Sequence, residues 1–153
     1  GNLISPCGEH GISASDESEA AAIEYALLNL PVTEIIVCGH SECSAMQALL
    51  QGREFVQSPN LKSWLRHGSG CLDQLTSSRL AVSSLEKHNR LSKLNVLEQI
   101  EHLKTYPVVQ SRIADGTLRL HGWWFDIRNA DVYGYEAATD QYRLIDEEYL
   151  KNI

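Results

Sequence analysis

Hydrophobic positions in the first third of the chain follow two different periods. Between Ser15 and Pro31 they have the three- and four-residue spacing of an amphipathic helix, at Ala20, Ile23, Ala26, Leu27 and Leu30. Residues 34–38 form a short apolar, β-branched run typical of a buried strand, and we expect Gly39 to end it. Helical spacing returns over residues 43–50. The pattern predicts a helix, a strand, a tight turn and a second helix.

The remainder of the chain predicts more helices and then two strands. Glycine and proline interrupt the middle of the chain, where we expect helices over residues 61–65, 72–87, 91–104 and 107–113. A long strand over residues 118–127, a turn at 129–131 and an antiparallel partner over 132–135 follow, with a short acidic helix at 146–150. No repeat or linker divides the chain, so residues 1–153 predict a single domain.

Composition and charge exclude several classes of protein. Lys and Arg number 13 against 20 Asp and Glu, and this net charge of −7 opposes nucleic-acid binding, which depends on cations that neutralise phosphates. No apolar stretch approaches the ~20 residues of a membrane span, and the first residues lack the pattern of a signal peptide. The four cysteines are unevenly spaced, so we expect reduced thiols in a cytoplasmic setting rather than disulfides.

The segment with candidate chemistry follows the first predicted strand. His40 and Cys43 are three residues apart, so one turn or helix start can direct both side chains at one ion. Imidazole nitrogen and thiolate sulfur are ligands that zinc prefers, and a helix N-terminus favours a thiolate. In α/β proteins, sites lie at the carboxyl ends of parallel strands. The spacing alone is weakly specific, and a buried pair that binds no metal is the alternative.

The same segment resembles the zinc motif C-G-H-S-x-C-G of the β-class carbonic anhydrases. This chain has Cys38-Gly39-His40-Ser41-Glu42-Cys43, with Ser44 where the family usually has Gly. Further blocks resemble the family in the same order: Gly1-Asn2-Leu3-Ile4, Ile23-Glu24-Tyr25-Ala26, Ile35-Ile36-Val37, Asn95-Val96, Tyr106-Pro107-Val108-Val109 and Gly122-Trp123-Trp124-Phe125-Asp126-Ile127. As a set these blocks are specific, since they cover most of the chain.

The resemblance implies a fold and a metal site. The fold would be α/β, a mainly parallel sheet flanked by helices with an antiparallel edge strand. His40 and Cys43 would each be a zinc ligand. The family's other two ligands, a Cys and an Asp in a C-x-D-x-R motif, would lie upstream of Gly1, as would the Arg that pairs with that Asp. We therefore expect residues 1–153 to be one β-carbonic-anhydrase-like domain that lacks its N-terminal segment.

The resemblance also implies an activity, the zinc-dependent reversible hydration of carbon dioxide to bicarbonate. Zinc with an open coordination position makes water acidic enough for this reaction. Family members are homodimers or higher homo-oligomers, so we expect the same here. The expected location is the cytoplasm or a compartment derived from it, such as a carboxysome or an organelle.

Two other functions compete with carbonic anhydrase. The chain would be a non-catalytic scaffold or assembly subunit of the same fold if no upstream C-x-D-x-R exists. Alternatively, Cys7 and His10 would join His40 and Cys43 in a closed structural zinc site, which leaves no open position for catalysis. Ser44 raises a separate question, because a side chain there would strain the backbone if the position requires a positive φ.

Overall fold

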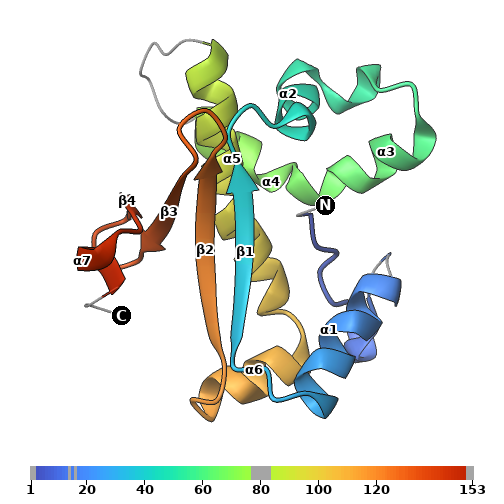
Figure 1. The fold of residues 1–153 in the computed structure, drawn as a ribbon. Coiled ribbons are helices and arrows are strands. Elements are labelled where there is room, and N and C mark those ends of the chain that lie inside the picture. The colour runs from blue at the N-terminus through green and yellow to red at the C-terminus, as the bar shows by residue number, and fades with distance from the viewer. Residues whose placement is uncertain (1–2, 14, 16, 77–83, 151–153) are drawn as a thin grey trace.

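The computed structural model describes residues 3–13, 15, 17–76 and 84–150 and contains a four-stranded sheet of order β1-β2-β3-β4 (Figure 1). β1 (Glu34–His40) pairs in parallel with β2 (Arg119–Asp126). β2 pairs antiparallel with β3 (Asp131–Glu136), which pairs antiparallel with β4 (Gln141–Leu144). One of these three pairings is parallel, and the antiparallel strands form one edge of the sheet.

Helices lie along one face and at both ends of the parallel pair of strands (Figure 1). The longest, α5, lies along the β1–β2 pair (Figure 1). None of the described helices is both long and apolar enough to cross a bilayer. The helices are α1 (Glu17–Asn29), α2 (Ser44–Gln51), α3 (Pro59–Trp64), α4 (Gly70–Thr76), α5 (Ser84–Leu103), α6 (Pro107–Ala114) and α7 (Glu147–Leu150), with short 3₁₀ turns at Glu9–Gly11, Arg53–Phe55 and Leu65–Gly68.

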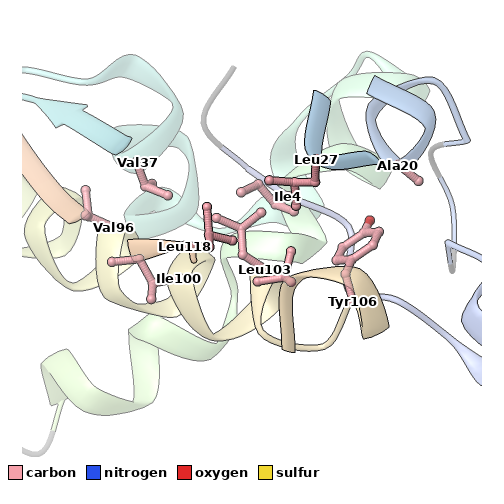
Figure 2. Packing of buried hydrophobic residues seen from close by; sticks show 10 residues of the cluster. Ile4, Ala20, Leu27, Val37, Val96, Ile100, Leu103, Tyr106 and Leu118 are labelled. Atoms are coloured by element: carbon pink, nitrogen blue, oxygen red, sulfur yellow. The ribbon is translucent and has the colours of Figure 1, made fainter. Parts of the chain in front are cut away.

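The core consists of two apolar clusters that α5 joins. Figure 2 shows the first cluster, in which Val96, Ile100 and Leu103 of α5 lie among side chains of β1, α1 and the N-terminal segment. The second cluster lies between α5 and the helices α2 and α4, and contains Leu3, Cys43, Met46, Leu49, Leu65, Cys71 and Leu91. Because Cys43 belongs to the second cluster, apolar packing of α2 also fixes one of the candidate metal ligands.

The predicted α/β fold, with flanking helices and an antiparallel edge, is confirmed, whereas two local predictions are wrong and one strand was missed. Gly39 does not end β1, which continues to His40. The break predicted between residues 87 and 91 is absent, since α5 is continuous there, while residues 77–83 of the predicted helix lie outside the described residues. β4 was not predicted from the pattern, because it is only four residues long and mostly exposed.

Gly39 is required where α5 crosses β1. A Cβ atom at this position would lie 2.7 Å from Val96 Cγ2, 3.0 Å from Ser92 Oγ and 3.2 Å from the backbone oxygen of Ser92. At Gly122, in the neighbouring strand, the two nearest atoms to a Cβ would be the side-chain ends Val96 Cγ1 at 3.1 Å and Ile100 Cδ1 at 3.2 Å. The helix therefore packs closely on the sheet because both strands present glycine to it.

We predict that Gly39→Ala lowers the free energy of unfolding by about 1–3 kcal/mol, as overpacking of a core does. Gly122→Ala should cost less, because rotation of two apolar side chains relieves its contacts. Urea denaturation of both variants measures the difference. Equal stability of Gly39→Ala and the wild type would contradict the close approach of α5 and β1.

An ion-pair cluster joins the amino-terminal ends of β1 and β2. Glu34 Oε1 accepts a hydrogen bond from Arg119 Nε at 2.8 Å, and Glu34 Oε2 lies 2.5 Å from His121 Nε2. The hydrogen bond from Arg119, followed by that from His121, lowers the pKa of the Glu34 carboxyl to about 2. Between pH 4.5 and about 2 the unfolded chain therefore binds more protons at Glu34 than the folded chain does.

This shift predicts a pH dependence of stability. The contribution of Glu34 should be complete above pH 4.5 and should be lost as the pH falls toward about 2, because the folded carboxyl stays ionised there. Urea midpoints at several pH values in this window measure the slope. Glu34→Gln and Arg119→Ala should each flatten it, and an unchanged slope in both variants would show that this cluster does not cause it.

Candidate metal centre

The two candidate ligands flank a two-residue turn at the carboxyl end of a parallel strand. His40 is the last residue of β1, Ser41 and Glu42 form the turn, and Cys43 is the residue before α2. Cys43 is 6% exposed and is a free cysteine. The location matches the predicted one, since ligand sites of α/β sheets lie where parallel strands end.

The His40 ring is oriented by the backbone of the following residue. Its Nδ1 lies 2.8 Å from the carbonyl oxygen of Ser41. A carbonyl oxygen can only accept a hydrogen bond, so Nδ1 carries the proton and the neutral ring has its lone pair on Nε2. Histidines that bind metals usually donate their other ring N–H in this way. The contact therefore leaves Nε2 of His40 available as a metal ligand.

Buried side chains hold the turn from two sides. Ser92 of α5 is 1% exposed, and its Oγ donates to the carbonyl oxygen of His40 at 2.8 Å. The same Oγ accepts from Trp124 Nε1 at 3.3 Å. On the side of β2, the Ser41 amide donates to the Phe125 carbonyl at 2.9 Å, and Ser41 Oγ accepts from the Ile127 amide at 3.0 Å. These bonds fix the backbone on both sides of the His40 side chain.

Lys93 lies among aromatic rings, one of which is the Trp124 indole that donates to Ser92. Lys93 Nζ is 4.2 Å from the Trp124 ring centroid and within 5.5 Å of the Tyr133 and Tyr142 centroids. Burial lowers the pKa of Lys93, and the Tyr142 hydroxyl donates to the Lys93 carbonyl at 2.9 Å. Cation–π attraction thus fixes the indole that bonds to Ser92. Sequence reasoning missed this cluster, because its four residues come from α5, β2, β3 and β4.

The structure contradicts the closed zinc site that includes Cys7 and His10. The Cys7 amide donates to Thr105 Oγ1 at 2.7 Å, just beyond the end of α5, whereas His40 is bonded to Ser92. Ser92 lies 11 residues before the end of α5 at Leu103, which corresponds to about 16 Å along the helix axis, and Thr105 lies beyond that end. The two pairs of residues lie toward opposite ends of the helix and cannot share one ion.

Among the described residues, Cys38 and Cys71 do not join His40 and Cys43 in a group of three metal donors. Cys38 is exposed on β1 and so lies outside the core. Cys71 lies buried near the start of α4, where its Sγ donates to the Gly68 carbonyl at 3.0 Å and burial raises the pKa of the thiol. Ser44 is the exposed first residue of α2 and has a helical backbone. It does not adopt a positive φ, so its side chain does not strain the backbone.

His40 and Cys43 fit a zinc site as two of its donors. One presents a nitrogen lone pair, and the other presents a free sulfur whose side chain makes no capping hydrogen bond to α2. Within residues 3–13, 15, 17–76 and 84–150, no three His, Cys, Asp or Glu side chains gather closely enough to hold a metal ion. At this turn the described residues therefore offer two candidate donors, fewer than the four of a structural zinc site.

Comparison with known proteins assigns the chain to a family. The family model described as carbonic anhydrase matches residues 1–132. The chain belongs to the β-class carbonic anhydrase family. The solved structure of the β-carbonic anhydrase CcaA superposes with a TM-score of 0.85 at 32% identity, over 95% of this chain and 63% of that one. The resemblance seen in the sequence and the predicted fold class are both confirmed.

Curated relatives carry the same family name. The carbonic anhydrase of Synechococcus elongatus is 34% identical over 148 residues, which are 96% of this chain and 53% of that protein. Carbonic anhydrase 1 of Escherichia coli O157:H7 is 31% identical over 93% of this chain and 62% of its own length. The tetrameric β-carbonic anhydrases of Sordaria macrospora give a TM-score of 0.68 at 28% identity, over 80% of this chain. The chain spans about half to two thirds of these relatives.

The buried serine beneath the turn generates a test of the site's rigidity. Ser92→Ala leaves the His40 carbonyl and the Trp124 indole N–H without their common partner. Each unpaired buried group costs about 1–3 kcal/mol, so the free energy of unfolding should fall by at least the lower figure. Ser111→Ala, at an exposed position of α6, is the control and should change stability little. If both variants unfold at the same urea concentration, Ser92 does not hold the turn.

Proposed function

We propose that this chain is the larger part of a zinc-dependent carbonic anhydrase that interconverts carbon dioxide and bicarbonate. The observation that carries the proposal is His40, whose Nδ1 donates its proton to the Ser41 carbonyl and which lies three residues before the buried thiol of Cys43. This pair lies at the carboxyl end of a parallel strand in a chain of the carbonic anhydrase family. The named relatives support the same activity.

Zinc would be held by His40 Nε2 and Cys43 Sγ, with two more ligands from an upstream C-x-D-x-R segment. When bound, zinc supplies a Lewis acid that lets water lose a proton near neutral pH. The chain's own residues prepare the ligands. The Ser41 carbonyl fixes the His40 tautomer, and apolar packing around Cys43 fixes the position of its sulfur.

The free edge of β1 supports the proposal that an upstream strand completes the sheet. β1 is at the end of the strand order within the described residues. A pocket of about 320 Å³ beside it is lined by the four successive residues 35–38, together with Ile4 and Ile23. Because successive strand side chains point to opposite faces, a pocket that touches four in a row follows the edge of the strand. A parallel strand added there would end beside His40.

A non-catalytic scaffold is the second candidate function. The observation in its favour is that the described residues bring no third metal donor to His40 and Cys43. A scaffold would keep the packing of α5 on the sheet without requiring a complete ligand set. The two candidates differ in whether the protein at its natural length has two further ligands.

We also propose a homo-oligomer, a homodimer or larger, in the cytoplasm or in a compartment derived from it, such as a carboxysome or an organelle. The tetrameric relatives from Sordaria macrospora support the oligomer. Exposed apolar side chains on α1 support it too, since Tyr25 is 60% and Leu28 is 69% exposed. Four free cysteines suit a reducing compartment.

The decisive experiment measures zinc content and carbon dioxide hydration in the protein at its natural length. The wild type should hold about one zinc per chain. His40→Ala and Cys43→Ser should each lose the metal and lower the hydration rate by at least about 100-fold, because removing a ligand costs more than disturbing its surroundings. Cys7→Ser should keep both. A wild type that binds no zinc and hydrates no carbon dioxide would favour the scaffold.

A further inference from the structure

One backbone conformation inside the ligand turn is unusual. Glu42, between His40 and Cys43, has a φ of 56°. Residues with a side chain rarely adopt this left-handed conformation, because Cβ crowds the following carbonyl oxygen. Such outliers persist only where the surrounding structure imposes them, and they concentrate at functional sites. The backbone direction from His40 to Cys43 therefore depends on whatever holds Glu42.

A side chain of α5 holds Glu42. Asn89 Oδ1 accepts a hydrogen bond from the Glu42 amide at 2.9 Å, across 47 positions of sequence. Glu42 also forms an ion pair with Arg128 at 3.5 Å. The side chains of Glu42 and Arg128 are both more than half exposed, so solvent screens this ion pair strongly. The bond to Asn89 is thus the contact suited to fixing the backbone at this residue.

Asn89 acts together with Ser92. The two are three positions apart on α5 and so lie on one face of the helix. Ser92 donates to the carbonyl of His40, while Asn89 accepts from the amide of Glu42. The helix therefore binds the turn on each side of Ser41. This pair of contacts fixes both the end of β1 and the point at which the chain enters α2.

We infer that Asn89 is a positioning residue for the metal ligands. Its amide oxygen holds Glu42 in the left-handed conformation and so directs Cys43 Sγ and His40 Nε2 toward one point. Asn89 does not touch the metal or the substrate. The inference rests on the proposed function, since it gives the turn the task of presenting zinc ligands.

The test measures zinc affinity by competition with a chromophoric chelator, in the protein at its natural length. Asn89→Ala should weaken zinc binding by about 10-fold, as loss of contacts around metal ligands does. Asn89→Asp keeps an acceptor oxygen at the same place and should retain most of the affinity. Lys87→Ala, at an exposed position of α5 two residues earlier, is the matched control and should bind zinc as the wild type does.

A second variant separates positioning from a general loss of structure. Glycine adopts a positive φ without steric cost, so Glu42→Gly should remove the need for Asn89. In the Glu42→Gly background, Asn89→Ala should then cost little zinc affinity. The absorption spectrum of the cobalt-substituted protein should change in Asn89→Ala and return toward that of the wild type in the double variant. Equal losses of affinity in both backgrounds would overturn the inference.

The outcomes distinguish the inference from the proposed function. If the wild type binds zinc and Asn89→Ala binds it equally well, the inference fails and the carbonic anhydrase proposal stands. If the wild type binds no zinc, the proposed function fails and a positioning role toward zinc fails with it. If Asn89→Ala weakens zinc binding and Glu42→Gly restores the affinity, the result supports both the inference and the proposed function.

Discussion

The close approach of α5 to the β1–β2 pair is the constraint on which the rest of the structure depends. Glycine at positions 39 and 122 lets Val96 lie directly against both strands. A side chain at position 39 would press against the backbone of α5 and move the helix outward, and Ser92 would then no longer reach the His40 carbonyl. The packing that builds the core therefore also sets the geometry of the candidate metal centre.

The turn between β1 and α2 has little intrinsic preference for its observed shape. It contains no glycine after Gly39, and Glu42 adopts a conformation unfavourable to it. Hydrogen bonds to Asn89 of α5 and to Ile127, just after β2, stabilise the observed conformation of the turn. A site assembled in this way is rigid only when the whole domain is folded, because its supports lie about 50 to 85 residues away in the chain.

Sequence patterns predicted the elements whose structure depends mainly on neighbouring residues in the chain. The spacing of apolar residues located α1, proline and glycine marked the ends of α6, and the His40–Cys43 motif located the candidate ligands at a strand end. Tertiary contacts decided the remainder. α5 stays helical through the polar residues His88, Asn89 and Arg90, where Asn89 is bonded to the ligand turn. β4 is held by pairing with β3 and by contact of the Tyr135 and Tyr142 rings, 5.4 Å apart, which no periodicity in four residues reveals.

The open edge of β1 has a consequence for how the domain can be divided. Hydrogen bonds between strands do not depend on whether the two strands belong to one polypeptide. A strand added as a separate peptide can therefore pair with this edge as a covalently attached strand would. The domain is thus suited to division into two polypeptides that reassemble. Within the described residues no strand pairs with this edge, and an uncovered strand edge is a template on which another copy can pair.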